Sequence, residues 1–395
     1  MRRLTIILAA LLCILNSGAL LARPTLFNKE HLNVSVHGRY QHMLDVHKLH
    51  DDMLYSYNSV LAGVQVGLDT RPADGSWWAN AYNFPSLSLG FSFDNTGALN
   101  TKPDTNLGDF YNLYLTLNFD FFRLGCFSMG PVLEVGATYC TDRYNSSSNP
   151  VNLFVGSNFL ANLACGLEAK VRFLPQWELA LTGNLIHHSN GMNCAPNLGT
   201  NQAALGGKLR YYLAPQETMR RVKVIPPEFR RCFDWNVYTS FGVHSCDWEL
   251  YADGRETYPV KPRMRALLGV ESQWRYSRIT STSLGMEANY ADNAHRHTDL
   301  RLRGVEDPQG YSPFYTSVHL SQHLHYAAFS AHFTWGVYTF KKTGLVEDIG
   351  RCYQKIGARY HLPEFKFGQL FLGFDMRAHY MDRSYCLEYS LGMAF

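Results

Sequence analysis

Residues 384–395 read Ser-Tyr-Cys-Leu-Glu-Tyr-Ser-Leu-Gly-Met-Ala-Phe, and the order of side chains in this stretch decides the fold class. From Tyr385 to Phe395 every second side chain is apolar, and the positions between them hold small or polar residues. Successive side chains of a β-strand point to opposite faces of a sheet, so the alternation predicts a strand with one wholly apolar face. Strands of soluble sandwiches are usually about five or six residues long, and this one is much longer.

Two other segments alternate in the same way. Residues 327–337 place Ala, Phe, Ala, Phe, Trp and Val on one face and mostly polar residues on the other. Residues 202–213 place leucine and tyrosine opposite Gln202, Lys208 and Arg210. An apolar face opposite a polar one over such lengths is typical of a lipid-facing wall around a polar lumen. Because closing the sheet pairs every backbone group, the pattern predicts an all-β, antiparallel transmembrane barrel rather than a sandwich.

The first residues are typical of a secretory signal peptide. Arg2 and Arg3 carry positive charge, residues 4–15 are almost wholly apolar, and small residues follow, which predicts cleavage after Ala22. No later segment approaches the roughly 20 uninterrupted apolar residues that a membrane helix requires. A final strand that ends on Phe395 resembles the C-terminal signature of outer-membrane proteins. We therefore expect a barrel in the outer membrane of a Gram-negative-type cell.

Charge and cysteine spacing exclude several classes of function. The formal net charge is +3 and is spread along the chain, which disfavours nucleic acid as a partner. No two cysteines have the Cys-x-x-Cys spacing of a thiolate zinc site, and disulfide pairing stays open. His319, His323 and His325 share one face of an expected strand, where we favour a polar lumen lining over a metal site. We expect neither a metal nor another cofactor.

The alternation predicts roughly 14 to 16 strands, with ends uncertain by a few residues. The candidate strands of the first half are 31–41, 58–70, 84–95, 108–121, 127–142, 157–173, 176–189 and 201–213. Those of the second half are 233–245, 263–277, 280–290, 312–324, 326–340, 350–362, 365–380 and 384–395.

Prolines and basic residues in 214–231 separate the two halves. We expect a signal peptide over 1–22, a first barrel half over 23–213, a linker over 214–231 and a second half over 232–395. A faint internal echo between the two halves, each copy ending in Leu-Pro before a long strand, indicates a duplicated eight-stranded unit. The sequence does not decide between one large barrel and two small ones, and we favour one because linked double barrels are uncommon.

One motif carries most of the functional information. Residues 185–191 read Leu-Ile-His-His-Ser-Asn-Gly, after an Asn-Pro-Val-Asn-Leu-Phe-Val-Gly-Ser block at 149–157 and before Pro-Asn-Leu-Gly-Thr-Asn at 196–201. This order resembles the lipid A 3-O-deacylase (acyloxyacyl hydrolase-related, PagL-type) family of outer-membrane barrels. The resemblance covers about residues 84–213, and the second half adds nothing to it.

Members of that family are serine esterases that remove an ester-linked acyl chain from lipid A. The resemblance implies that His187 is the general base, that Ser189 is the nucleophile, and that Asn190 with a neighbouring backbone amide forms the oxyanion site. The founding enzymes carry a glutamate where this chain has Asn201. An asparagine oxygen can still orient an imidazole, but it cannot offset the imidazolium charge, so we expect a lower rate or no turnover.

The strand pattern gives an independent reason to group these residues. His187 and Ser189 share the face of Leu185, about 7 Å apart along the strand, and Asn201 shares the face of Leu205. All three therefore face lipid, where a serine esterase would meet lipid A or a related acylated membrane lipid. A base on an adjacent same-face position can activate a serine hydroxyl, which is otherwise unreactive.

Three alternatives stay open. His187 and Ser189 could simply meet lipid headgroups at a strand end. Asn149, Asn152 and Ser157 could be turn residues that support the adjacent loop, which is the interpretation we favour. The whole chain could be a non-catalytic barrel, either a structural protein or a pore, since roughly 16 strands can enclose a water channel.

Overall fold

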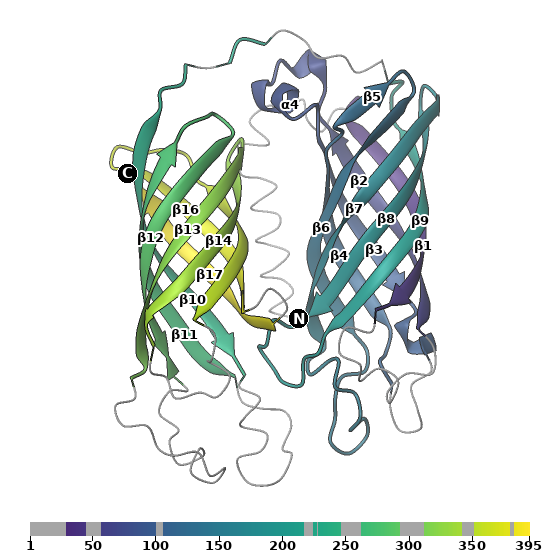
Figure 1. Ribbon diagram of the computed structural model, residues 1–395. Helices are drawn as coiled ribbons and strands as arrows, with labels where there is room; N and C mark the ends of the chain where they lie inside the picture. Colours follow the sequence, from purple (N-terminus) through teal and green to yellow (C-terminus); the bar gives the residue numbers. More distant parts are fainter. Residues whose placement is uncertain are drawn as a thin grey trace. The chain divides into compact units, whose positions relative to one another are not determined.

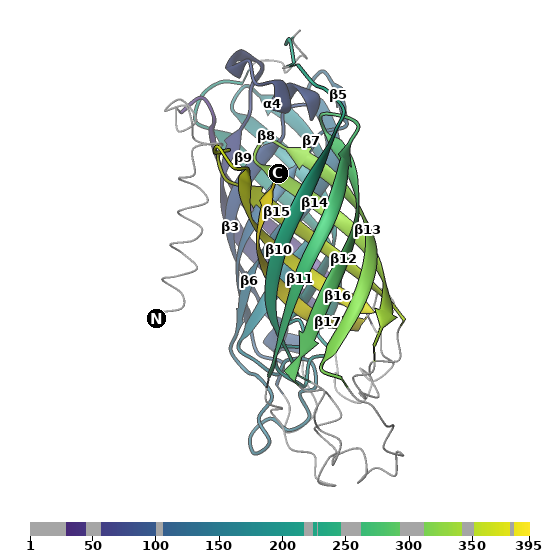
Figure 2. The ribbon, with the colours of Figure 1, turned by 90° about the vertical axis from the view of Figure 1, so that its left-hand side faces the viewer.

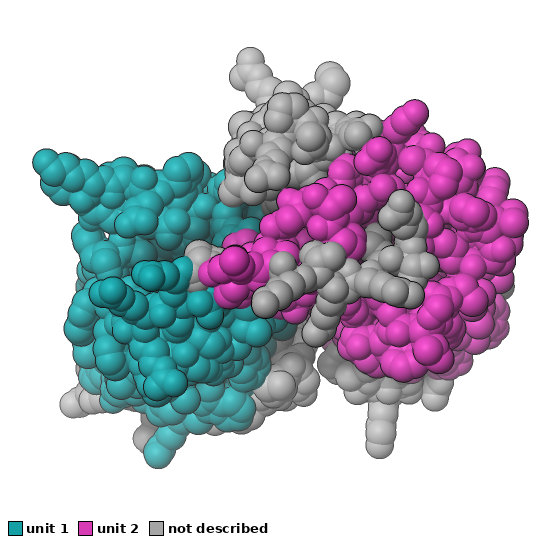
Figure 3. All heavy atoms as spheres, turned by 90° about the horizontal axis from the view of Figure 1, so that it is seen from above, with its two compact units in different colours: residues 1–22, 191–195, 227–395 teal, residues 23–190, 196–226 magenta. Residues whose placement is uncertain are grey.

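The computed structural model describes residues 29–44, 57–99, 106–216, 224–226, 228–245, 262–292, 312–341, 351–379 and 383–395. The expected signal peptide lies outside the described residues, as does much of the expected linker. The chain folds as two compact units, one built mainly from residues 23–190 and 196–226 and the other mainly from residues 227–395 (Figure 3). Each unit is an antiparallel barrel (Figures 1 and 2).

The first unit closes through its own strands. β1 pairs with both β2 and β9, the sheet continues through β8 and β7 to β6, and β6 pairs with β4 to complete the ring. A short β5 pairs only with β6, and a short helix α4 lies between β2 and β3. The strands are β1 (Leu32–Met43), β2 (Asn58–Asp69), β3 (Ser86–Asp94), β4 (Phe110–Asn118), β5 (Phe122–Leu124), β6 (Phe127–Cys140), β7 (Phe159–Leu174), β8 (Trp177–Ser189) and β9 (Thr200–Tyr212), and the helices are α4 (Trp77–Ala81) and the 3₁₀ turns η1 (Pro72–Asp74) and η2 (Thr96–Leu99).

The second unit is a closed barrel in which each strand pairs with the next and β10 pairs with β17. Its strands are β10 (Cys232–His244), β11 (Arg263–Arg275), β12 (Thr280–Ala291), β13 (Phe314–Tyr326), β14 (Phe329–Phe340), β15 (Cys352–His361), β16 (Gln369–His379) and β17 (Arg383–Ala394). No described helix in either unit is long and apolar enough to cross a membrane.

The preference for one large barrel was wrong. Each half closes on itself, because β9 pairs with β1 and β17 pairs with β10. The alternating pattern is the same in both arrangements, so it could not reveal which strand edges meet. The fold class and the sixteen long strands agree with the expectation, whereas the short β5 was not predicted.

The alternation of faces is confirmed along the strands. Leu205 of β9 is 70% exposed, whereas Lys208 and Arg210 of the same strand are buried. Tyr389 and Leu391 of β17 are likewise exposed. In a membrane these outward faces contact lipid, and the inward faces line a polar lumen.

The start of β17 departs from the pattern. Tyr385 and Leu387, both expected on the outer face, are buried. The ring of Tyr385 packs against the ring of His379, with 4.4 Å between centroids, and lies under the guanidinium of Arg265 at 4.1 Å. Tyr385 is the extra residue of a β-bulge in β17, since Arg377 pairs with Cys386 and Ala378 pairs with Ser384. Leu387 keeps the regular register, and its side chain is buried against Gly191.

Paired charges fill the inside of the first barrel. Glu168 accepts hydrogen bonds from Lys208 at 2.6 Å and from Arg210 at 3.3 Å, and Arg39 forms a two-bond ion pair with Glu134. A buried charge is costly unless it is paired and hydrogen-bonded, so these side chains balance one another. An eight-stranded barrel is just wide enough for side chains to fill it.

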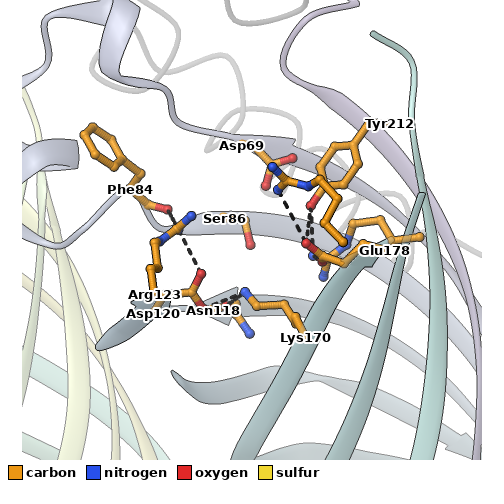
Figure 4. A pocket seen from close by; sticks show the side chains of 11 residues that line it. Asp69, Phe84, Ser86, Asn118, Asp120, Arg123, Lys170, Glu178 and Tyr212 are labelled. Carbon is orange, nitrogen blue, oxygen red and sulfur yellow. Dashed lines mark hydrogen bonds and ion pairs between the residues drawn. The ribbon is translucent and has the colours of Figure 1, made fainter. Parts of the chain in front are cut away.

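A polar pocket lies at one end of the same lumen, where β2, β4 and β9 finish (Figure 4). Asp120 forms ion pairs there with Lys170 at 2.6 Å and with Arg123 at 2.8 Å. Glu178, the second residue of β8, accepts a hydrogen bond from the hydroxyl of Tyr212 at 3.0 Å. Since β8 begins at this end, its last residues lie at the opposite end of the barrel.

The second lumen is also lined by paired charges. Glu287 contacts Lys355 at 2.5 Å and Arg377 at 2.8 Å, and it accepts a hydrogen bond from the hydroxyl of Tyr353 at 3.0 Å. Arg377 also donates to Glu388 at 2.6 Å. The same lumen contains His319, His323 and His325, which are buried, so their predicted inward direction is confirmed.

We expect the protein to form no stable ion channel. The pore alternative assumed one ring of roughly 16 strands, whereas eight-stranded rings leave little room beside their interior side chains. Single-channel recording in a planar bilayer, with a 16-stranded porin as positive control, measures this. Conductance steps as large as those of the porin would contradict filled lumens.

Candidate active site

The predicted site residues of β8 lie at the end of the strand, where its alternation of faces continues. Leu185 and His187 lie on the outward face, whereas Ile186 and His188 are buried inside the barrel. His187 is partly buried, unlike Leu185, which is exposed. In the register between β8 and β9, His187 pairs directly with Asn201. The predicted outward direction of His187 and Asn201 agrees with the alternation of both strands.

The side chains of this pair form a hydrogen bond. His187 Nδ1 lies 2.8 Å from Asn201 Oδ1. An amide oxygen is an acceptor only, so the hydrogen of the neutral imidazole belongs on Nδ1 in this contact. Nε2 of His187 is then an acceptor, which is the form that a general base needs.

Ser189 and His187 converge at Gly199. Gly199 has a φ of +68°, and a Cβ atom added to it would lie 3.2 Å from Ser189 Cβ and 3.3 Å from His187 Cε1. The same atom would lie only 2.8 Å from the carbonyl oxygen of His188. Both side chains therefore flank residue 199. Its positive φ and its close neighbours leave room only for glycine at this position. Ser189 itself is 3% exposed, so the expectation that it faces lipid was wrong, because its side chain packs against the Gly199 turn.

Asn190, predicted at the oxyanion site, follows the serine and is also buried. Its backbone N–H donates a hydrogen bond to Asn197 Oδ1 at 2.9 Å. This bond ties the residue after Ser189 to the Pro-Asn-Leu-Gly turn. The backbone amide of Asn190 is thus engaged within the turn, so an oxyanion role for this residue rests on its side-chain amide.

The residues of the 149–157 block mainly bond to backbone groups, as the turn interpretation expected. Asn149 and Asn152 both donate to the carbonyl oxygen of Asn106, and Ser157 donates to the carbonyl oxygen of Phe159. None of these bonds reaches His187 or Ser189. The loop nevertheless contacts the site through its backbone.

An apolar cluster closes the barrel behind the site. It includes Phe110, Phe154, Val155 and Leu160, all buried. The ring of His188 packs edge-on against Phe110, with 5.0 Å between ring centroids. This packing holds the end of β8 from inside the barrel while His187 points outward.

Sequence reasoning gave no role to Asn197 or Gly199. The Pro-Asn-x-Gly pattern did carry a signal, since glycine in such a turn often adopts a positive φ. What the glycine contacts could not be inferred from spacing. Within the described ranges, no group of three or more His, Cys, Asp or Glu residues is placed to hold a metal ion.

Each of the two barrels matches a protein-family model. Residues 62–210 match the model of lipid A 3-O-deacylase (PagL), and residues 233–395 match the model of the acyloxyacyl hydrolase C-terminal domain. Both barrels therefore resemble the lipid A 3-O-deacylase family. The expectation that the second half adds nothing to the resemblance was wrong, because this half of the chain matches a domain model of its own.

Solved structures of outer-membrane barrels are also similar to this chain. The outer-membrane enzyme PagL is 14% identical with a TM-score of 0.30, over 44% of this chain and 97% of its own. The β-domain of the Bordetella autotransporter BrkA is 11% identical with a TM-score of 0.27, over 92% of this chain and 98% of its own. OccAB1 of Acinetobacter baumannii is 8% identical with a TM-score of 0.22, over 94% of this chain and 97% of its own. No curated protein matches the chain.

The family matches and the outward apolar faces agree on location. The protein consists of two β-barrels of the outer membrane.

Gly199→Ala should lower the free energy of unfolding by about 1–2 kcal/mol, because alanine is strained at a positive φ and its Cβ would press on the carbonyl of His188. Urea unfolding in lipid vesicles measures the loss. Gly183→Ala is the matched control, since an added Cβ on this outward glycine of β8 meets no atom within 4 Å. Equal midpoints for the two variants would contradict a constrained Gly199.

Proposed function

We propose that the protein is an outer-membrane serine esterase that removes an ester-linked acyl chain from lipid A. The observation that carries this proposal is the His187–Asn201 hydrogen bond on the outer wall of β8 and β9, beside Ser189 and around Gly199. A base that is oriented by a third group and lies next to a serine is the arrangement of a nucleophilic hydrolase. The family match to lipid A 3-O-deacylase supports the same substrate class.

The reaction would run in two steps. Ser189 Oγ attacks the ester carbonyl while Nε2 of His187 takes the hydroxyl proton. The resulting imidazolium then donates that proton to the departing sugar oxygen, which leaves as a hydroxyl. Water then attacks the acyl-serine with the same base, and the fatty acid leaves. Asn201 keeps the imidazole oriented through Nδ1, and the side-chain amide of Asn190 stabilises the oxyanion, a contribution of about 10²–10³ in rate for such donors.

The outward direction of the site suits a substrate that is itself a membrane lipid. Leu181, Leu185 and Leu205 lie on the same outward face of β8 and β9, and all three are exposed. An acyl chain can lie against this apolar wall while its ester remains at the strand end. A water-soluble ester would have no such surface to bind.

A second candidate function is a non-catalytic barrel that keeps the esterase scaffold. Asn201 favours it, because an uncharged amide stabilises the imidazolium that forms when His187 takes a proton less than a carboxylate would. The filled interiors of both barrels favour a structural role over a pore within this alternative.

Ser189→Ala should abolish release of the fatty acid while leaving the barrel folded, because the variant removes only the attacking oxygen. Mass spectrometry of lipid A from cells that carry the wild type, the variant or neither protein measures the loss of one acyl chain. Heat-dependent mobility on denaturing gels reports folding. Deacylation by the folded variant would end the serine mechanism.

Asn201→Glu should raise kcat about tenfold, which corresponds to about 1.4 kcal/mol of added stabilisation of the imidazolium. Asn201→Ala should lower kcat, since it removes the group that orients His187. Both are measured with purified protein in detergent on lipid A. An Asn201→Ala variant as fast as the wild type would show that the hydrogen bond to His187 plays no part in turnover.

A further inference from the structure

Asn152 lies in the connection between β6 and β7 and is 0% exposed. Its Nδ2 donates to the carbonyl oxygens of Asn106 and Asp142, each at 3.0 Å. Its Oδ1 accepts from the backbone N–H groups of Phe154 and Val155, each at 3.2 Å. The amide thus uses both donor hydrogens and its acceptor oxygen inside the loop.

The segment that Asn152 holds is joined to the Gly199 turn by backbone hydrogen bonds. The N–H of Leu198 donates to the carbonyl oxygen of Leu153 at 3.1 Å, and the N–H of Gly199 donates to the carbonyl oxygen of Phe154 at 3.0 Å. Gly199 in turn lies between Ser189 and His187. A continuous series of short contacts therefore runs from the Asn152 amide to the two side chains of the site.

The same segment is anchored from below. The side chains of Phe154 and Val155 are 0% exposed within the apolar cluster that fills the barrel mouth, and Leu153 and Leu198 pack against that cluster. With its side chains fixed in the core and its backbone fixed by Asn152, the segment offers a rigid edge to the turn. Rigid support of this kind matters because a displacement of about 1 Å can cost about 10²-fold in rate.

We propose that Asn152 is a positioning residue of the esterase site, acting through the backbone of Phe154 and Gly199 to set the placement of Ser189 against His187. This inference rests on the proposed function. The side-chain hydrogen bonds of Asn152 reach neither of the two reacting side chains, so its effect is on the geometry of the reacting groups. Its removal should lower kcat and leave KM nearly unchanged.

Asn149 provides a matched control in the same loop. It is also buried, and it donates to the carbonyl oxygens of Asn106 at 2.8 Å and Arg143 at 3.1 Å. Its Oδ1 accepts from the N–H of Asn106 at 2.9 Å. Asn149 therefore has the same chemistry and similar burial, but none of these bonds reaches the segment joined to Gly199.

The experiment compares kcat and KM of the full-length protein, purified in detergent, on lipid A. Asn152→Ala should lower kcat about 10- to 100-fold with KM changed less than about threefold, as expected for a displaced reacting group. Asn149→Ala should change kcat less than about threefold. Asn152→Ser should recover part of the loss, because a serine hydroxyl can accept the N–H of the residue two positions on. Heat-dependent gel mobility shows that each variant is folded.

The outcomes separate the two proposals. Activity of Ser189→Ala, assayed alongside, would overturn the esterase itself. An inactive Ser189→Ala together with equal kcat for Asn152→Ala and Asn149→Ala would overturn the positioning role alone. Should Asn152→Ala fail to fold, Asn152→Ser is compared with Asn149→Ser by the same criterion. Absence of turnover by both the wild type and Asn201→Glu would overturn both proposals.

Discussion

Backbone hydrogen bonds that must be satisfied inside lipid govern this structure. A strand edge that faces hydrocarbon leaves N–H and C=O groups unpaired, at a cost of several kcal/mol for each group. The chain meets this requirement twice, through the β1–β9 and β4–β6 pairings in one barrel and through the β10–β17 pairing in the other. These closures set the width of each barrel and therefore what its interior can hold.

Closure with eight strands leaves an interior that side chains fill. Glu168 with Lys208 and Glu287 with Lys355 show that the interior is polar and internally balanced. A lipid substrate would have no access to such a lumen, so chemistry on a membrane lipid has to take place on the outer wall. His187 occupies that wall, and its neighbour His188 packs inside the barrel against Phe110. One strand thus serves both the core and the candidate site.

The candidate site combines local and distant contributions. His187 and Ser189 come from one strand, and the register of the adjacent strand brings Asn201 opposite His187. Gly199 lies in the connection between β8 and β9, and the 152–155 segment lies in the connection between β6 and β7. Their backbone bonds fix the turn against the strand end. The strands determine the direction in which the reacting side chains point, and the connections determine the distance between these side chains.

The sequence by itself determined the strands, their faces and the His187–Ser189 motif, because each of these depends on a period of two residues or on a short local pattern. That period predicts the long strands, the buried Lys208 and the exposed Leu205. The inward direction of Tyr385 was not predicted, since it is the extra residue of a bulge in its own strand.

Only the tertiary structure decided that each half closes as its own barrel, since alternation is identical for every choice of strand edges that meet. It also decided what Gly199 touches and what Asn152 holds. A turn motif can reveal that a glycine needs a positive φ. The atoms that then surround that glycine are brought together from separate loops, and no spacing in the chain records them.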